Sequence, residues 1–165
     1  MLVRESISFI RDQDPKVSLG IGQVHLIKKW LDEMSIINYV INDDMSIDVK
    51  GNINLDYKNL TSIPEFIKFN KVGGYFYCDN NQLTSLEGCP KTVERDFFCS
   101  SNQLTSLEGC PNIVKGNFYC NNNKLTSLEG CPKTVGGSFF CSNNQKKFTE
   151  KEVRKYCKVR GSIYI

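Results

Sequence analysis

The sequence predicts an α/β repeat protein: a small solenoid of stacked coils with one parallel β-sheet and a cap at each end. Three observations predict it. A 21-residue motif recurs through the middle of the chain, apolar residues alternate within each copy, and helix-forming segments flank the repeats. A chain of 165 residues that is 40% hydrophobic can build the core of a single domain. Because a short coil cannot bury its own apolar interior, the coils must stack.

An N-terminal cap of two helices and a β-hairpin is expected over residues 1–48. A short helix is predicted around 3–12, followed by a loop over 12–22 and a second helix over 22–34. That second helix places apolar residues on one face at helical spacing: Val24, Ile27, Leu31 and Met34, with Trp30 beside them. The strands YVI and SIDV, which flank Asn42-Asp43-Asp44-Met45, predict the hairpin that leads into the repeats.

The repeats form about five coils over residues 49–145. Full copies begin at Val72, Val93 and Val114, a truncated copy begins at Val135, and a degenerate copy begins at Val49. Side chains alternate across a strand, so Phe and Cys two residues apart are expected to point inward together. These inward pairs are Phe76 and Cys78, Phe97 and Cys99, Phe118 and Cys120, and Phe139 and Cys141.

Other residue types recur once per coil where the chain must bend. An asparagine is expected to satisfy backbone groups at the turn, a glycine to adopt left-handed geometry, and a proline to extend the return path. The asparagines are Asn81, Asn102, Asn123 and Asn144; the glycines are Gly88, Gly109 and Gly130; the prolines are Pro90, Pro111 and Pro132. A structural role is therefore predicted for all three residue types.

The pattern F-x-C-x-x-N-x-L in each coil fits the leucine-rich-repeat core L-x-L-x-x-N-x-L, with Phe and Cys in place of two leucines. The chain resembles the short bacterial type of leucine-rich repeat and, more narrowly, the LTSLEGCP repeat proteins of tailed bacteriophages. The segments IKKWLDEM and YVINDDMSIDV are similar to the leader of those proteins. The resemblance implies a phage accessory protein whose partner is a host or defence protein. One departure is that Gly73, Glu94, Lys115 and Gly136 occupy the first leucine position, with valine one place earlier.

A C-terminal cap is predicted over residues 146–165. Thr149 and Glu152 form a capping box, and Phe148 and Val153 form the matching hydrophobic staple. A helix is therefore expected from about 150 to 157, and Ser162–Ile165 is expected to add one last strand. The two caps and the repeats are expected to form one compact unit.

The composition favours a soluble, cytoplasmic protein. The formal charge is only +3, no apolar run is long enough to cross a membrane, and no secretory signal is evident. The eight cysteines follow the repeat spacing and are expected to be reduced, buried hydrophobes. The single histidine, His25, and the absence of catalytic or metal-site motifs predict a protein that is not an enzyme and has neither metal nor cofactor.

The candidate binding residues are the aromatic residues between the two inward positions of each strand. They are Tyr77, Phe98, Tyr119 and Phe140, with Tyr75 and Asn117 at flanking positions. Stacked at the strand spacing, the four rings would form a stripe about 14 Å long. Two interpretations remain open: the stripe is an interaction site, or the rings only stabilise the ladder.

The sequence favours non-enzymatic binding of another protein through this face. The alternatives are sequestration of a nucleotide or single-stranded nucleic acid on the rings, and self-association, for example as a homodimer. A nucleic-acid partner is the weaker expectation, and no membrane partner is expected. Seven basic residues in the last twenty are expected to form a solvated face of the cap: Lys146, Lys147, Lys151, Arg154, Lys155, Lys158 and Arg160.

Overall fold

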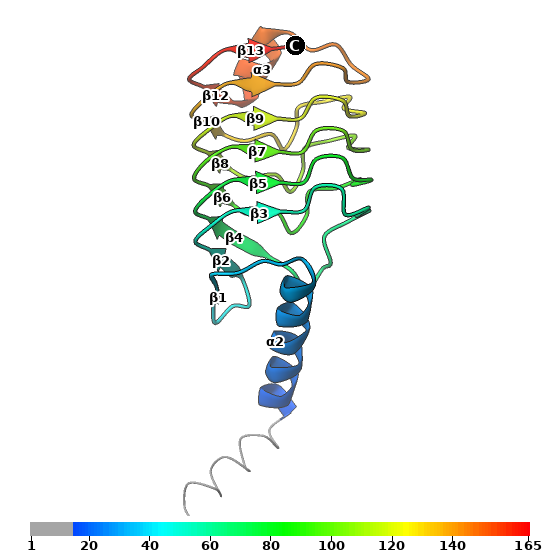
Figure 1. Ribbon diagram of the computed structural model, residues 1–165. Helices are drawn as coiled ribbons and strands as arrows, with labels where there is room; N and C mark the ends of the chain where they lie inside the picture. The colour runs from blue at the N-terminus through cyan, green and yellow to red at the C-terminus, as the bar shows by residue number, and fades with distance from the viewer. Residues whose placement is uncertain (1–14) are drawn as a thin grey trace, which may run out of the picture.

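A computed structural model describes residues 15–165 as a parallel β-solenoid of about six stacked coils. Helix α2 projects from the N-terminal end, and a second helix, α3, lies at the C-terminal end (Figure 1). The solenoid fold and the C-terminal helix are therefore confirmed. The helix predicted around residues 3–12 lies outside the described residues.

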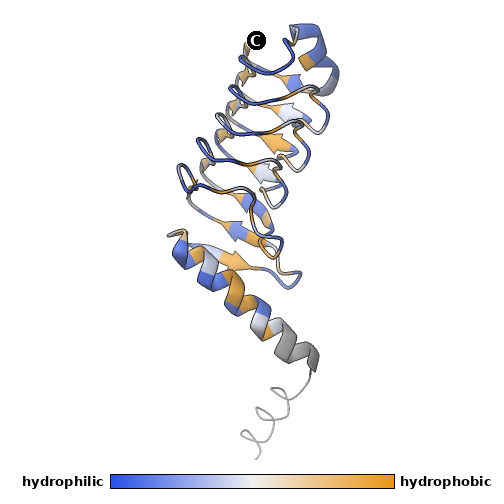
Figure 2. Ribbon diagram, turned by 90° about the vertical axis from the view of Figure 1, so that its right-hand side faces the viewer, coloured by the Kyte–Doolittle hydropathy of each residue, from blue (hydrophilic) through white to orange (hydrophobic). Residues whose placement is uncertain are grey.

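Helix α2 spans Pro15–Glu33, so the prediction of a loop through residue 22 was wrong. Proline fits the first turn of a helix, where its missing N–H has no intrahelical partner, and Gly20 and Gly22 weaken a helix without preventing it. The predicted apolar face is confirmed for its central residues, since Ile27 and Leu31 are fully buried. Hydrophobic and hydrophilic residues lie beside each other along this helix (Figure 2).

The strands form two sheets instead of the single sheet that was expected. Sheet A has seven strands: β1 (Tyr39–Ile41), β2 (Ile47–Val49), β4 (Phe69–Val72), β6 (Thr92–Val93), β8 (Ile113–Val114), β10 (Thr134–Val135) and β12 (Lys158–Val159). Sheet B has six strands: β3 (Ile53–Asn54), β5 (Phe76–Tyr77), β7 (Phe97–Phe98), β9 (Phe118–Tyr119), β11 (Phe139–Phe140) and β13 (Ile163–Tyr164). Within residues 15–165, the β1–β2 hairpin is the single antiparallel pair, and all other strand pairs are parallel.

The valine that departs from the leucine-rich-repeat consensus accounts for the second sheet. Val93 pairs with Val72 on one side and with Val114 on the other, so each coil contributes a short strand to sheet A before it bends toward sheet B. Each valine is fully buried. A β-branched residue suits a pleated, half-buried strand, and its regular recurrence stacks one valine on the next.

Sheet B follows the predicted alternation. Phe76 and Cys78 are fully buried, and the equivalent Phe and Cys residues of the following coils are buried as well. The phenylalanine rings stack through the core, with centroids 5.2 Å apart between Phe76 and Phe97 and 5.6 Å apart between Phe97 and Phe118. The asparagines also behave as predicted, because Asn81, Asn102 and Asn123 are buried and bonded to backbone.

Each full repeat has two positions with left-handed backbone geometry, at two different bends of the coil. The predicted glycine geometry is confirmed at Gly88, Gly109 and Gly130, where φ is +88°, +82° and +80°. A Cβ at Gly109 would lie 2.5 Å from the backbone nitrogen of Glu87, so the coil spacing also requires glycine there. A second left-handed position, which was not predicted, immediately precedes the recurring asparagine of each repeat, at Asn80, Ser101, Asn122 and Asn143.

The C-terminal segment contains more of the solenoid than was predicted. Helix α3 spans Glu150–Tyr156, and the capping box is present because Thr149 and Glu152 exchange hydrogen bonds. Phe148 and Val153 are both buried, as the predicted staple requires. Strands β12 and β13 then add a further coil beyond residues 49–145, so the segment predicted as a cap also includes part of the solenoid.

Candidate functional site

Sheet B carries a continuous stack of aromatic rings on its outer surface, here called the ring ladder. Its members are Tyr77, Phe98, Tyr119, Phe140 and Tyr164. Successive centroids lie 4.8, 4.6, 4.4 and 4.5 Å apart, and successive ring planes differ by only 4 to 12°. The parallel register imposes this geometry, because it aligns Tyr77 with Phe98 and Phe98 with Tyr119 at the strand spacing.

The rings cover each other's faces, so the ladder presents ring edges to solvent. The four predicted rings are half-buried, although they lie on the outer surface. Tyr164, the last ring, is 51% exposed because no further coil covers it within residues 15–165. At the other end, Tyr75 stacks against Tyr77 with centroids 5.7 Å apart and an interplanar angle of 27°.

One flank of the ring ladder is a row of polar side chains bonded from coil to coil. Asp96 Oδ1 accepts a hydrogen bond from the backbone N–H of Asn117 at 2.7 Å. Asn117 Oδ1 in turn accepts one from the N–H of Ser138, also at 2.7 Å. The predicted site residue Asn117 therefore lies beside the rings, but its carbonyl oxygen is already used within the solenoid.

The other flank contains two neighbouring carboxylates, Asp56 and Asp79. Asp56 Oδ1 accepts from the backbone N–H of Asp79 at 2.7 Å, and Asp79 accepts from the N–H of Ser100. Partial burial raises the pKa of Asp79 to about 6, and the nearby charge of Asp56 adds to the rise, while the bond from Ser100 opposes it. Desolvation also raises the pKa of Asp56. The end of the ring ladder at Tyr77 is therefore its acidic end.

The structure brings the predicted site residues together. Tyr77, Phe98, Tyr119 and Phe140 form one stack, and Tyr75 joins it. The ring that sequence reasoning missed is Tyr164, which pairs with Phe140 across β11 and β13. The sequence signal for Tyr164 was its position between Ile163 and Ile165. This segment repeats the earlier alternation of an outward aromatic residue between two apolar residues, but with isoleucines in place of Phe and Cys.

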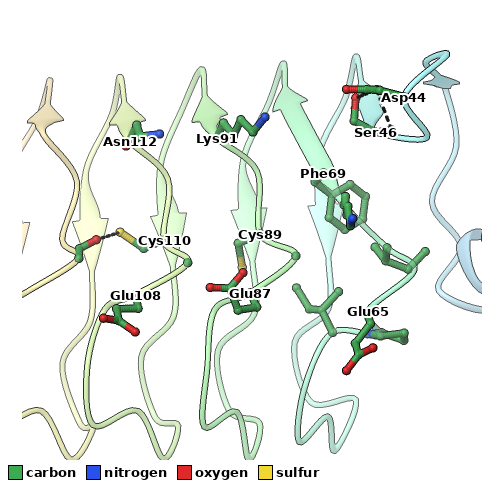
Figure 3. Close-up of a pocket in the computed structure, with 17 residues that line it drawn as sticks. Asp44, Ser46, Glu65, Phe69, Glu87, Cys89, Lys91, Glu108, Cys110 and Asn112 are labelled. Atoms are coloured by element: carbon green, nitrogen blue, oxygen red, sulfur yellow. Dashed lines mark hydrogen bonds between the residues drawn. The ribbon is translucent and has the colours of Figure 1, made fainter.

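A groove of about 970 Å³ runs along the side of the solenoid that leads into sheet A (Figure 3). Glu65, Glu87 and Glu108 follow one rim, and Lys91 with Asn112 lies on the sheet side. Cys89 is buried in the groove wall, but Cys110 and Cys131 remain partly exposed, so these cysteines fill the far side less completely than predicted. Within residues 15–165, none of these three glutamates forms an ion pair with a lysine or an arginine.

The described cysteines have the chemistry of buried thiols. All eight are free, and burial raises the pKa values of Cys78, Cys99 and Cys120 well above the usual range. Over residues 15–165, no group of three or more His, Cys, Asp or Glu is placed to hold a metal ion. In the same part of the chain, no helix is long and apolar enough to cross a membrane.

Comparison of the chain with protein-family models, with curated proteins and with solved structures found no match. The class that the geometry defines is a parallel β-solenoid with an outward aromatic ladder.

Proposed function

We propose that this chain is a non-enzymatic binding protein that docks a protein partner on the ring ladder. The observation that carries the proposal is a row of five aromatic rings that lies on the outer surface of sheet B. Contiguous aromatic surface is enriched at protein interfaces, where tyrosine and tryptophan supply much of the binding energy. The resemblance to phage repeat proteins suggests a host or defence protein, met in the host cytoplasm, as that partner.

The ladder is well suited to a protein partner because it is already ordered. The stacked rings cannot rotate independently, so little side-chain entropy is lost when a partner covers them. The polar flanks are fixed too, since Asp96 and Asn117 are bonded to the next coil. The result is an ordered apolar surface with a polar border on each side, which resembles the core and rim of a protein interface.

The same stacking argues against sequestration of a nucleotide on the rings. A base stacks on a free ring face, and the faces of Phe98, Tyr119 and Phe140 are each covered on both sides by neighbouring rings. Self-association through the ladder remains the alternative, because a second copy presents the same ordered apolar surface. Light scattering at two protein concentrations distinguishes self-association from binding of a different protein, since dimerisation raises the apparent mass with concentration.

The decisive experiment is site-specific photo-crosslinking in bacterial lysate. A photoreactive phenylalanine analogue is placed at Phe98 or Phe140 in the ladder, and in a matched control at Tyr57, which is 73% exposed but lies outside it. The proposal expects the same discrete partner to be crosslinked from both ladder positions and not from Tyr57. A Phe98→Ala/Tyr119→Ala variant, checked for folding by circular dichroism, should recover at least tenfold less of that partner.

Two results would contradict the proposal. One is crosslinking of the same set of proteins from Tyr57 and from the ladder, which would indicate nonspecific contact. The other is equal recovery of the partner by the wild type and the folded Phe98→Ala/Tyr119→Ala variant.

A further inference from the structure

The outer face of sheet A carries a strongly basic surface, here called the basic face. Seven exposed basic residues lie on it or at its margins: Lys71, Lys91, Arg95, Lys115, Lys133, Lys158 and Arg160. Two acidic residues lie among them. Glu94 bridges Lys71 at 3.2 Å and Lys115 at 2.6 Å. Asp48 of β2 is half-buried beside Lys71 and accepts hydrogen bonds from the Asn70 side chain and the Lys71 backbone N–H. The other five basic residues make no ion pair within residues 15–165.

The strand register sets the spacing of these charges. Lys71 aligns with Thr92, and the row continues through Ile113 and Thr134 to Lys158. Four steps at the strand spacing make the basic face about 19 Å long. That length is close to the axial rise of six base pairs, at 3.4 Å per nucleotide along each strand.

The basic face continues onto the C-terminal cap. Arg154 of α3 donates a hydrogen bond to the carbonyl oxygen of Val159 in β12 at 3.2 Å, which holds the helix against the edge of sheet A. Arg154, Lys155 and Lys158 line one shallow hollow at this junction. Arg154 and Lys155 of the cap therefore lie beside Lys158 of sheet A.

The small net charge of the chain does not reveal how its acidic and basic residues are arranged on the surface. The glutamate row of Glu65, Glu87 and Glu108 lies on the opposite rim of the groove from Lys91 (Figure 3). These positive and negative charges thus form separate rows on the two rims of the groove, and the whole chain has a formal charge of only +3. A partner that meets sheet A meets a surface on which exposed basic residues outnumber the acidic residues Asp48 and Glu94.

We propose that the basic face binds the phosphate backbone of double-stranded nucleic acid without reading its bases. Lysine is depleted at protein interfaces, whereas lysine and arginine supply the contacts to phosphates. The outward residues of the central strands are Thr92, Ile113 and Thr134, so the face lacks rings on which unpaired bases could stack. Charge and length therefore fit a duplex better than an acidic protein or a single strand.

The test is fluorescence anisotropy with a labelled 20-base-pair duplex of arbitrary sequence, titrated from 50 to 300 mM salt. Wild type is expected to bind with a Kd of about 1–100 μM near physiological salt, with little dependence on sequence. A Lys91→Glu/Lys133→Glu variant should bind at least tenfold more weakly. The slope of log K against log salt should also become shallower by about 2, because each lost phosphate contact removes about 0.9.

The matched control is Lys58→Glu/Lys124→Glu, which changes the net charge equally at exposed loop residues that follow β3 and β9. It should stay within about threefold of wild type. Thermal unfolding checks that each variant is folded, and Lys91→Gln/Lys133→Gln provides a milder version of the test. The Phe98→Ala/Tyr119→Ala variant should keep its duplex affinity, so failure of the ring-ladder proposal and failure of this one give different results.

Three results would overturn the inference. The first is an absence of duplex binding at 50 mM salt. The second is equal weakening by the two pairs of lysine substitutions, which would indicate attraction to net charge alone. The third is tighter binding of polyglutamate or of a single strand than of the duplex, which would assign the basic face to a different class of partner.

Discussion

The buried asparagines show how one side chain connects two consecutive coils. Asn102 Oδ1 accepts from the backbone N–H of Leu83 at 2.9 Å, and its Nδ2 donates to the carbonyl oxygens of Cys78, Cys99 and Ser100. Only an amide of this length both donates and accepts in one plane. The sequence predicted the role from the residue type, but not that the bonds reach into the preceding coil.

Asn102→Ala should lower the free energy of unfolding by about 3 kcal/mol. The reason is that several buried backbone groups lose their partner, and each unsatisfied group costs about 1–3 kcal/mol before relaxation. Urea denaturation measures the change. Gln103→Ala is the control, because its exposed amide makes no such bonds, and it should change stability by less than about 0.5 kcal/mol. Equal effects of the two substitutions would contradict the role assigned to Asn102.

Asp79 occupies a position at which the following coils have an uncharged residue. The equivalent positions hold Ser100 and Asn121, and only the acidic end of the ring ladder places a carboxylate there. Its pKa is raised to about 6, so the folded state holds the proton more tightly than the unfolded chain. A group of this kind makes the folded state more stable as the pH falls through 6 toward the unfolded value of 3.8.

Asp79→Asn should therefore stabilise the protein at pH 7.5 by about 1 kcal/mol, because it removes a partly desolvated charge and keeps an oxygen that accepts from Ser100. The gain should shrink between pH 7 and pH 4.5, as the wild-type carboxyl becomes neutral. Thermal unfolding of both proteins across this range gives the difference. Asp96→Asn serves as the comparison on the opposite flank. A gain that stays constant with pH would show that Asp79 does not titrate as described.

At the scale of elements, the C-terminal helix depends on its cap. Helix α3 has only seven residues, too few to be stable by propensity alone. Its first turn is secured by the exchange between Thr149 and Glu152, and Lys146 pairs with Glu152 at 2.7 Å. The lysine and the threonine hydroxyl hold the pKa of Glu152 at about 2. The stabilisation that the ionised Glu152 gives to the folded state is complete above pH 4.5 and is lost as the pH falls toward 2.

Thr149→Ala should reduce stability by about 1 kcal/mol, because it removes the side-chain bond to the backbone N–H of Glu152. Hydrogen exchange should show the loss concentrated in α3 and β12, where Arg154 joins the helix to Val159. Thr149→Ser, which keeps the hydroxyl, should retain most of the protection. Uniform loss of protection along the whole solenoid would instead mean that α3 and the coils unfold together.

The two sheets show how far sequence reasoning reached among the elements. Sheet B was predictable because Phe, an outward ring and Cys alternate with a period of two, which only a strand explains. In sheet A each repeat contributes one inward valine, such as Val93, and the residues two places before and after it, Lys91 and Arg95, are basic, so no period of two can be recognised. Its pairing depends on the previous coil, so it becomes visible only when the coils are stacked.

At the scale of the whole molecule, the core is a closed column of thiols, phenylalanines and leucines. It runs without a break from Ile27 in α2 to Val159 in β12. Burial raises the pKa values of the central thiols, which keeps them in the unreactive protonated form.

Alkylation of the folded protein with iodoacetamide at pH 8 should therefore leave Cys78, Cys99 and Cys120 unmodified, because the thiolate is the reactive species and these thiols are fully buried. The same residues should react completely in 6 M guanidinium. Mass spectrometry of the digested protein assigns each site, and the partly exposed Cys110 and Cys131 serve as internal comparisons. Rapid labelling of Cys99 under native conditions would contradict a closed column.

The charge of the molecule is likewise a property of the assembled coils. The sequence shows a nearly balanced composition, and its lysines appear scattered along the repeats. Stacking places Lys91 and Lys133 in one row and the glutamates of the LEGCP segments in another, on opposite rims of one groove. A surface suited to phosphates thus arises from a chain whose net charge alone does not indicate one.

The sequence by itself determined the coil, the inward Phe and Cys, the outward rings and the C-terminal helix, because each depends on local alternation, capping or a fixed repeat length. The tertiary structure alone decided the second sheet, the addition of Tyr164 to the ring ladder and the separate rows of charge on the two rims of the groove. Those features depend on which residues of different coils lie side by side, and that register is set by the stacking of the coils.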